Sequence, residues 1–407
     1  MDIDGLVDEN YIRTLVVERR WTHKEISNFL KENYPGKDGL SEMSVRRYCK
    51  VNNIHKSSRL PDNQLDVVVS NAVSQVGPTY GRKMLKGKLE AEGVRVHDKR
   101  ISKSLQRVAP GYHQQRVQNT ARLFNPLPYK SDYFGHKIHL DQNEKLVMYG
   151  CTTVIASDGY SNYVLAAASM PVKNNVEIYR AVLRPILLEY GLWDQVRVDC
   201  GKEFYLTLFV QETLAPHRCN TLRKPFKQTP STKNHMAERH WVEVNGRVNY
   251  PIKQQLHKMV QEELIDMTDE IDKYCVSWIT IQTVQAGIQE LLPAWNNHSI
   301  PGKGKPVNIM RTCYSAVSLQ EHSIPTPEAA VLQYERAGGK LKHFGLFGVD
   351  PLESDPFLRA TRSREFLKHF PSFDVIFNEL VNNKPNMMRQ AVMLFINITR
   401  DLAVSSS

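Results

Sequence analysis

The stretch RVDCGKEFYL, residues 197–206, reads as the end of an apolar strand followed by the start of a helix. Asp199 stands where the strand ends, Gly201 follows where the backbone has to turn, and Glu203 opens the helix. A carboxylate placed at the end of a strand is suited to holding something positively charged. The stretch therefore predicts a strand–turn–helix unit at a functional edge of a sheet.

The periodicity around this stretch indicates more strands and helices of the same domain. Strands are expected at HKIHLD (136–141), MYGCTTVIAS (148–157) and NYVLAAASM (162–170), with DGYS (158–161) as a tight turn. Helices are expected over 174–190 and 202–214, and a long helix from about residue 232. A meander of three strands followed by a helix, a fourth strand and more helices indicates an α/β fold with a mixed sheet covered by helices.

Two aspartates end strands in this scheme. Asp141 ends the first strand and Asp199 ends the fourth. If those strands are neighbours, the two carboxylates emerge at one edge and repel each other unless a cation lies between them. Mg²⁺ accepts one or two carboxylates and keeps waters for phosphate oxygens. Glu238, on the long helix, would complete a two-metal site for phosphoryl transfer.

Three motifs in this order carry a family resemblance. HLDQNEKL (139–146), VDCGKEF (198–204) and NHMAER (234–239) resemble the three acidic motifs of the retroviral-integrase and DDE-transposase superfamily. The gap of 38 residues between Asp199 and Glu238 is close to that typical of integrases, and Asn234 stands at the family's Asn-x-x-x-Glu interval. SDGYSN (157–162) and ERHWVEVNGRVN (238–249) are similar to integrase-core proteins derived from eukaryotic transposons.

The resemblance implies an RNase H-like fold and an activity. Water would cleave DNA at an element end, and the freed 3′-hydroxyl would then attack a target phosphodiester. Asp141 would bridge two Mg²⁺ or Mn²⁺ ions, with Asp199 and Glu238 each holding one. Supporting roles are expected for Asn143, Gly201, Glu203 and Asn234.

The N-terminal third is the basic part of the chain. Of a net charge of +10, residues 11–130 hold 23 Lys and Arg against 10 Asp and Glu. Residues 8–54 predict three helices: a capping box at Thr22 to Glu25 precedes the second, and the third starts after Ser41 with Met43, Val45 and Tyr48 inward. Residues 62–110 repeat the order, with Asp62 and Asp98 as helix caps. Two helix-turn-helix modules are therefore expected, although a pair of bundles with merely solubilising lysines is the alternative.

The expected domains are these two modules, a linker over 111–135, a catalytic core over 136–260 and a helical interaction or oligomerisation region over 261–407. A basic loop between the second and third acidic motifs, which also contains Arg218, is expected to border the site, with a solvated surface as the alternative. The residues expected to bind DNA are Arg46, Arg47, Lys50, Lys99, Arg100, Lys103, Arg107, Arg223, Lys224, Lys227, Lys233 and Arg239.

Several nearby residues have a plainer interpretation. Asp158 is expected to be a turn residue rather than a metal ligand, and Trp241 is expected to pack in the core. His235 and His240 are expected at the surface or facing DNA rather than on a metal.

The composition indicates the cellular compartment, and two alternatives to the integrase function stay open. The six cysteines lack metal-binding spacing, and no apolar run is long enough to span a membrane, so we expect reduced thiols and a nuclear protein. The expected partners are double-stranded DNA, both element ends and target, and further copies of the chain. A domesticated DNA-binding or chromatin regulator with an idle site is the alternative to the integrase, and an RNase H-type nuclease is a third interpretation.

Overall fold

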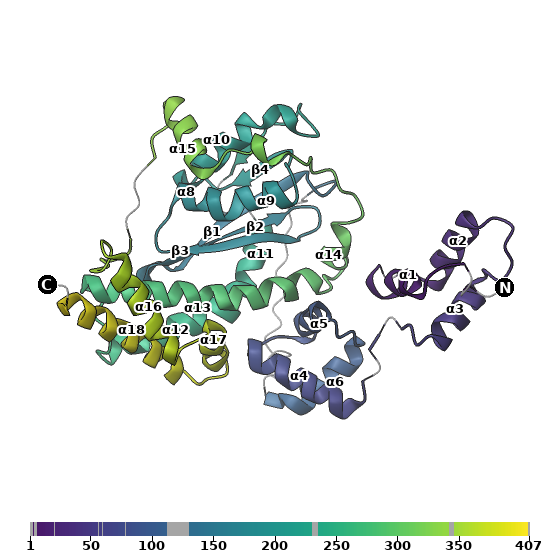
Figure 1. Cartoon of the computed structure of the whole chain (residues 1–407), viewed down its shortest axis with the longest axis horizontal. Coiled ribbons are helices and arrows are strands. Elements are labelled where there is room, and N and C mark those ends of the chain that lie inside the picture. Colours follow the sequence, from purple (N-terminus) through teal and green to yellow (C-terminus); the bar gives the residue numbers. More distant parts are fainter. Residues whose placement is uncertain are drawn as a thin grey trace.

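The structure is a computed structural model of the chain, and it describes residues 3, 6–19, 21–55, 57–58, 60–77, 79–111, 130–229, 235–341 and 346–405. Figure 1 shows a central body in which helices cover a sheet, with two smaller helical units below and to the right of it. The first of these units stands apart from the body and the second lies against it. The predicted linker lies mostly outside the described residues.

The first helical unit surrounds an apolar core of its own. Its segments are α1 (Glu9–Arg13), the π-helix η2 (Thr14–Glu18), α2 (His23–Asn33) and α3 (Glu42–Val51). The predicted capping box is present, because the Glu25 N–H donates to Thr22 Oγ1 at 3.2 Å and the Thr22 N–H donates to Glu25 Oε2 at 2.5 Å. In α3, Val45 and Tyr48 are buried as predicted, whereas Met43 is exposed. Residues two apart in a helix do not share a face, so Met43 cannot join Val45.

The second helical unit has the same order of helices and a separate core. Its helices are α4 (Asp62–Val76), α5 (Arg82–Ala91) and α6 (Asp98–Val108). The predicted caps are wrong by one residue: Pro61 and His97 hold the cap positions of α4 and α6. The carboxylate of Asp62 pairs instead with Arg100, and that of Asp98 pairs with Lys86. These carboxylates therefore tie helices together rather than ending them.

Helix α5 is docked on α13 (Glu270–Asn297), the longest helix of the central body. At Gly87, a Cβ atom would lie 2.1 Å from the backbone oxygen of Ala294, so only glycine allows this approach. The buried Lys88 pairs with Glu290 of α13 beside that contact. The second unit is therefore part of the central body's packing.

The sheet of the central body is mixed and has the strand order β3-β2-β1-β4-β5. The strands are β1 (Lys137–Leu146), β2 (Cys151–Asp158), β3 (Val164–Met170), β4 (Gln195–Val198) and β5 (Phe226–Gln228). The first three form the predicted antiparallel meander, and β4 and β5 run parallel to β1. Strand β5 was not predicted, because three residues of mostly polar sequence give no alternation to detect.

Helices cover both faces of this sheet. On one face lie α8 (Asn175–Ile178), the π-helix η4 (Tyr179–Leu183), α9 (Arg184–Glu189), η5 (Lys202–Phe204) and α10 (Tyr205–Thr213). On the other face lie α11 (His235–Val244), the π-helix η8 (Asn245–Asn249), α12 (Tyr250–Gln261) and α13. This layered arrangement is the RNase H-like architecture that the sequence predicts, with helical regions on either side of it in the chain.

The chain after residue 260 is helical, as predicted, but it does not form a separate region. Its other segments are α14 (Pro306–Ile309), η9 (Glu321–Ser323), α15 (Pro327–Arg336), α16 (Pro356–His369), α17 (Phe373–Val381) and α18 (Asn386–Ser405). Tyr314 bridges to Phe134, and Val317 bridges to Leu192. Ala316 is buried in the sheet's core. The core thus extends beyond the predicted boundary at 260, because apolar residues near 316 complete it.

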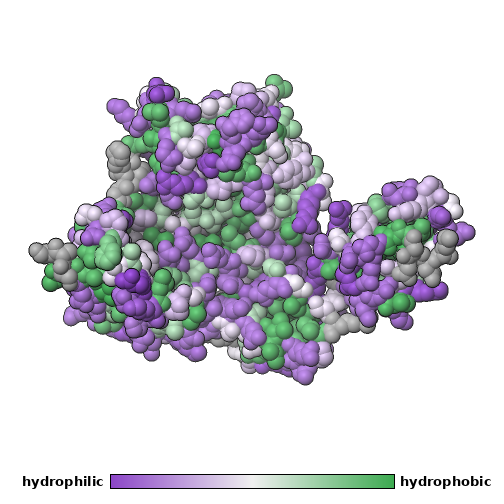
Figure 2. Space-filling model, in the orientation of Figure 1, coloured by the Kyte–Doolittle hydropathy of each residue, from purple (hydrophilic) through white to green (hydrophobic). Residues whose placement is uncertain are grey.

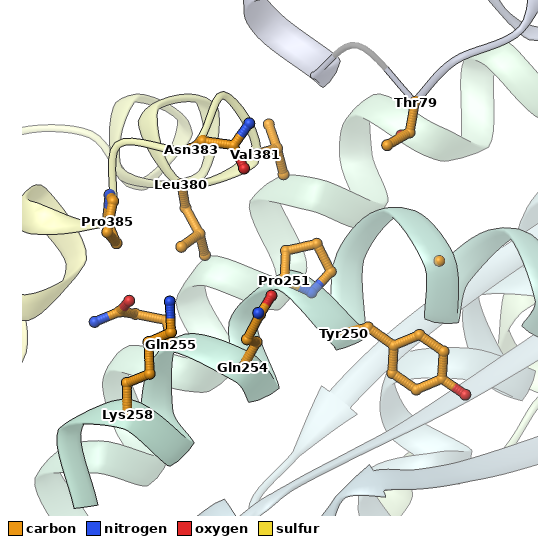
Figure 3. A pocket seen from close by; sticks show the side chains of 11 residues that line it. Thr79, Tyr250, Pro251, Gln254, Gln255, Lys258, Leu380, Val381, Asn383 and Pro385 are labelled. Carbon is orange, nitrogen blue, oxygen red and sulfur yellow. The ribbon is translucent and has the colours of Figure 1, made fainter. Parts of the chain in front are cut away.

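A cavity of about 380 Å³ lies where three parts of the chain meet (Figure 3). Its walls come from Thr79 of the second unit, from Tyr250 and Pro251 of α12, and from Leu380 and Pro385 near the C-terminal helices. None of its lining residues belongs to the predicted site. Figure 2 shows mainly hydrophilic residues on the visible face, with apolar residues gathered over the second helical unit. In the described part of the chain, no helix has the length and apolar character needed to cross a membrane.

Candidate active site

Asp141 lies on β1, and Asp199 lies just after the end of the neighbouring strand β4. The parallel register of β1 and β4 ends with His139 paired with Arg197. Continued by two residues, one of them past the end of β4, the same register sets Asp141 across from Asp199. The prediction that Asp141 ends its strand is wrong, since β1 continues to Leu146 and Asp141 is paired with Ile155 of β2. Asp199 directly follows the last residue of β4, as predicted. The strands are neighbours as the hypothesis requires, so the two carboxylates share one edge of the sheet.

Helix α11 lies over Asp141. The indole N–H of Trp241 donates to Asp141 Oδ2 at 2.9 Å, and α11 packs on β1. Trp241 is buried in the core as predicted, but this hydrogen bond was not foreseen. The only hint in the sequence is that Trp241 follows Glu238 by three residues and so shares its face of a helix. The contact therefore turns the face of α11 that carries Trp241 toward β1.

Part of the third acidic motif lies outside the described residues. Asn234 and Lys233 belong to this part, as do the side chains of Glu238 and His235. The backbone of Glu238 is described as part of α11. The site can therefore be built from two aspartates, the helix that bears Glu238 and their neighbours.

A short turn holds Asp199. The backbone N–H of Gly201 donates to Asp199 Oδ1 at 3.0 Å. Gly201 has φ −70°, which any residue adopts, so the turn itself does not require glycine. A Cβ on Gly201 would lie 2.5 Å from the carboxyl carbon of Glu203, so the end of that side chain would have to shift. The buried Glu203 accepts a hydrogen bond from Lys173 at 3.2 Å.

Asn143 joins β1 to the helix segment that follows α11. Its Nδ2 donates to Asn245 Oδ1 at 3.0 Å, and its Oδ1 accepts from the Lys145 N–H at 2.9 Å. Asn249 also donates to Asn245 at 2.9 Å, which completes a small amide network. The network fixes η8, and hence the end of α11, to the strand that carries Asp141. Asn143 is thus placed to position the site rather than to touch a substrate.

The loop before β5 is only partly available to a ligand. Arg218, expected to face DNA, is buried and donates to backbone oxygens, including that of Asp194 at 2.6 Å and that of Arg223 at 2.7 Å. It holds the loop together because its guanidinium replaces missing backbone hydrogen bonds. Lys224 and Lys227 are exposed, and Arg223 is half-buried.

The other predicted DNA contacts fall into two groups. Five are exposed on α3 or α6, and one on α11: Arg46, Arg47, Lys50, Lys99, Lys103 and Arg239. Arg100 and Arg107 are held by α4 instead, since Arg100 Nε donates to Asp62 Oδ1 at 3.1 Å and Arg107 Nε donates to Asp66 Oδ2 at 2.7 Å. These arginines lower the pKa of Asp62 and Asp66 by hydrogen bonding. Both arginines serve the packing of α6 on α4 in this structure.

Asp158 and His240 complete the list of nearby candidates. Asp158 is fully buried at the end of β2 and accepts from the Ser161 N–H at 2.7 Å and the Trp193 indole N–H at 3.0 Å. Burial raises its pKa, and these hydrogen bonds oppose the rise. Asp158 is a turn residue, as predicted. His240 is buried against Trp295 with ring centres 4.7 Å apart, so its predicted place at the surface is wrong.

The donors at the site suit a hard divalent ion. Carboxylate oxygens are the ligands that Mg²⁺ prefers, and both aspartates are oriented by N–H donors, from Trp241 and Gly201. Among side chains that the structure describes, no three from His, Cys, Asp and Glu lie close enough to hold a metal, and Glu238 is outside that set.

A comparison with protein families identifies the domain that contains the sheet. Residues 129–322 match the family model described as integrase core domain. This segment is an integrase core domain. The match covers slightly less than half of the chain, and it includes the residues near 316 that pack back onto the sheet. No curated protein matches the chain.

The match supports the resemblance to the retroviral-integrase and DDE-transposase superfamily that the three motifs predicted. Proteins with this domain interact with nucleic acid. Asp141 and Asp199 lie in the part of the chain that matches, and so does α11 with Glu238. The open end of the sheet at these residues is therefore the candidate active site.

Proposed function

We propose that this protein is a DDE-type polynucleotidyl transferase that cleaves DNA ends and joins them to target DNA. The observation that carries the proposal is the level register of Asp141 and Asp199 on parallel strands, with α11 fixed above Asp141 by the Trp241 hydrogen bond. An enzyme of this kind needs three carboxylates on rigid elements. In this proposal a strand carries Asp141, a strand end carries Asp199 and a helix carries Glu238.

Each acidic residue has a separate role in the proposal. Asp141 would bridge two Mg²⁺ or Mn²⁺ ions, and Asp199 and Glu238 would each hold one. Bound ions would supply the charge that activates the attacking oxygen and stabilises the leaving oxygen. The chain's own contribution is rigidity, because Trp241, Gly201 and the Asn143 network hold the carboxylates and α11 in place before DNA arrives.

The rest of the proposal follows from the arrangement of the helical units. The two units have the helix order of helix-turn-helix modules, and exposed cations on α3 and α6 could contact double-stranded DNA. Strand transfer into two DNA strands calls for at least two protomers, so we infer a homo-oligomer that works in the nucleus. Asn234, Lys233 and Arg239 would contact DNA or the helix at the third motif.

A DNA-cleavage assay tests the activity directly. The full chain is incubated with duplex DNA and Mg²⁺ or Mn²⁺, beside Asp199→Asn and Glu238→Gln. Glu212→Gln, an exposed carboxylate on α10 at the other face of the sheet, is the matched control. We expect nicking that needs metal, that is lost in both site variants and that survives in the control.

A second candidate function is a domesticated DNA-binding regulator with an idle site. The helical units favour it, because they could bind DNA whether or not the carboxylates are active. DNA binding by the native chain and both site variants, with cleavage by none, would support the regulator and contradict the enzyme. A nuclease without strand transfer would nick DNA but yield no joined product.

A further inference from the structure

Basic residues gather on the open part of the sheet face that carries the two aspartates. The register pairs Arg197 of β4 with Lys227 of β5, and it pairs Lys137 of β1 with Gln195 of β4. By strand alternation these cations share the face of Asp141, while Ile138 and Val196 point into the apolar core on the other side. Helices α11 to α13 cover the β1-β2-β3 half of this face. Among the described residues, no helix packs on the β4-β5 half of this face, and the basic residues lie there.

The pairing of these cations does not stabilise the fold of the free protein. Arg197 and Lys227 are opposite partners across two strands, and like charges in that position destabilise a sheet. Neither has an ion pair with an acidic side chain among the described residues. In the same part of the chain, the Nε atoms of Arg197 and Arg223 are buried without a hydrogen-bond partner.

The positive charges of neighbouring residues also affect the pKa of Lys137. Burial lowers the pKa of Lys137, and the charges of Arg197 and Arg223 lower it further. Arg223 lies on the loop before β5, so it adds a fourth cation to this region. Lys137 also donates to the backbone oxygen of Lys130 at 2.6 Å. A cluster of like charges at one place on a protein raises the local concentration of ions of opposite charge.

The position of these cations indicates which anion they fit. Arg197 precedes Asp199 by two residues on one strand, which is about 6.6 Å at the usual rise per residue. Lys137 precedes Asp141 by four residues on the neighbouring strand, which is about 13 Å. The cations therefore lie at successive distances from the two carboxylates along the strands. A polymer with regularly spaced negative charges could contact these cations one after another.

We propose that Lys137, Arg197, Arg223 and Lys227, here called the basic stripe, bind backbone phosphates of DNA on one side of the phosphate held at Asp141 and Asp199. The inference rests on the proposed function for its choice of DNA. It adds that one DNA strand leaves the candidate active site along β4 and β5. Lys137 and Arg197 are the new members, since no local pattern in the sequence places them beside Arg223 and Lys227.

The test uses the salt dependence of DNA binding by the full chain. Fluorescence anisotropy with a labelled duplex, in EDTA so that nothing is cleaved, gives Kd over 50 to 200 mM salt. Each phosphate contact contributes about 0.9 to the slope of log Kd against log salt. For Arg197→Gln/Lys227→Gln we expect a slope shallower by about 1.8, so that the variant loses about tenfold less affinity over this range than the native chain.

A matched pair of substitutions controls for net charge. Arg336→Gln/Lys340→Gln removes two exposed cations at and just beyond the end of α15, which packs on α10 at the other face of the sheet. This control should keep the native slope. Arg197→Lys, which keeps the charge, should also keep it. Because Arg197 and Lys227 repel each other, the double variant should have an unchanged or higher Tm.

Two results would overturn the basic stripe. One is native DNA binding with an unchanged slope in Arg197→Gln/Lys227→Gln. The other is a lower Tm in that variant, which would give the two residues a structural role. If the native chain itself fails to bind DNA, the proposed function fails with the stripe. If it binds and cleaves DNA while the variant matches it, only the stripe fails.

Discussion

Trp241 connects the helix that carries Glu238 to the strand that carries Asp141. Its indole N–H donates to Asp141 Oδ2, and its ring packs in the core below. Groups of this kind, which orient a metal ligand without binding the metal, strongly influence affinity and rate. The three acidic motifs could be recognised in the sequence because each is short and local. The Trp241 contact could not, because no local pattern shows which atom of a buried side chain meets a strand about 100 residues earlier.

Replacing Trp241 by phenylalanine should separate packing from orientation. Trp241→Phe keeps an aromatic ring but loses the N–H, so we expect about 10- to 100-fold less metal-dependent cleavage and a higher Mg²⁺ requirement. Cleavage rates measured over a range of Mg²⁺ concentrations check this. Trp278→Phe, in the C-terminal helices where the ring stacks on Phe395, is the control and should keep the native Mg²⁺ requirement. Equal effects of the two substitutions would show that Trp241 acts by packing alone.

His136 should make the stability of the core depend on pH. It accepts a hydrogen bond from the Asp132 N–H at 3.0 Å, which requires a neutral ring. Burial, followed by the charges of Lys137 and Arg223, lowers its pKa to about 4. The unfolded chain therefore takes up a proton at this residue before the folded chain does. Stability should be fully present above about pH 6.5 and should fall as the pH drops from there toward 4.

Urea unfolding between pH 4 and pH 7 tests this expectation. His136→Gln cannot be protonated, so the variant should lose less stability on acidification than the native chain. His322→Gln, an exposed histidine, should leave the pH dependence as it is. The same pH dependence in His136→Gln as in the native chain would contradict a neutral buried His136.

For the secondary-structure elements, sequence periodicity predicted most of the strands and helices, but not where each one ends or which strands pair. The meander, β4, and the helices over 175–189 and 205–213 lie where alternation and helical spacing placed them. Strand β1 runs beyond Asp141 because it pairs with β2 as far as Leu146, and pairing across a sheet is not a local signal. For the same reason β5 was missed: it is a strand only because β4 offers hydrogen bonds to it.

The contact between α5 and α13 depends on the missing side chain of Gly87. Gly87→Ala would bring a Cβ to 2.1 Å from a backbone oxygen of Ala294, so the two helices must move apart. We expect a loss of about 1–3 kcal/mol in the free energy of unfolding, as for overpacked cores. Gly246→Ala is the control, since no atom lies within 4 Å of the added Cβ. In a helix that change should stabilise by about 0.5–1 kcal/mol. Equal effects of the two substitutions, measured by urea unfolding, would contradict a tight contact.

On the scale of the whole molecule, the two helical units differ in their attachment. The first has its own core and stands apart in Figure 1, while the second is packed on α13 and pairs Lys88 with Glu290. Sequence periodicity gave them the same architecture and no reason to treat them differently. The distinction comes from a buried glycine, Gly87, and a buried lysine, Lys88, whose partners lie about 200 residues away.

Truncation should reveal this difference. Removing residues 1–55 should leave the main thermal unfolding transition unchanged while DNA binding weakens. Removing residues 1–111 uncovers the face of α13 at Ala294, so we expect a clearly lower Tm or aggregation. Calorimetry of both truncated chains beside the full chain checks this. A similar fall in Tm for both would mean that the first unit is also part of the core's packing.

A DDE-type enzyme requires that Asp141, Asp199 and Glu238 meet around divalent cations. A crystal of the full chain soaked in Mn²⁺ tests it most directly, because anomalous scattering locates the metal without reference to any assay. We expect an anomalous peak between Asp141 and Asp199, with Glu238 on α11 as a further ligand. A crystal that binds Mn²⁺ elsewhere, or that shows Glu238 turned away from both aspartates, would contradict it.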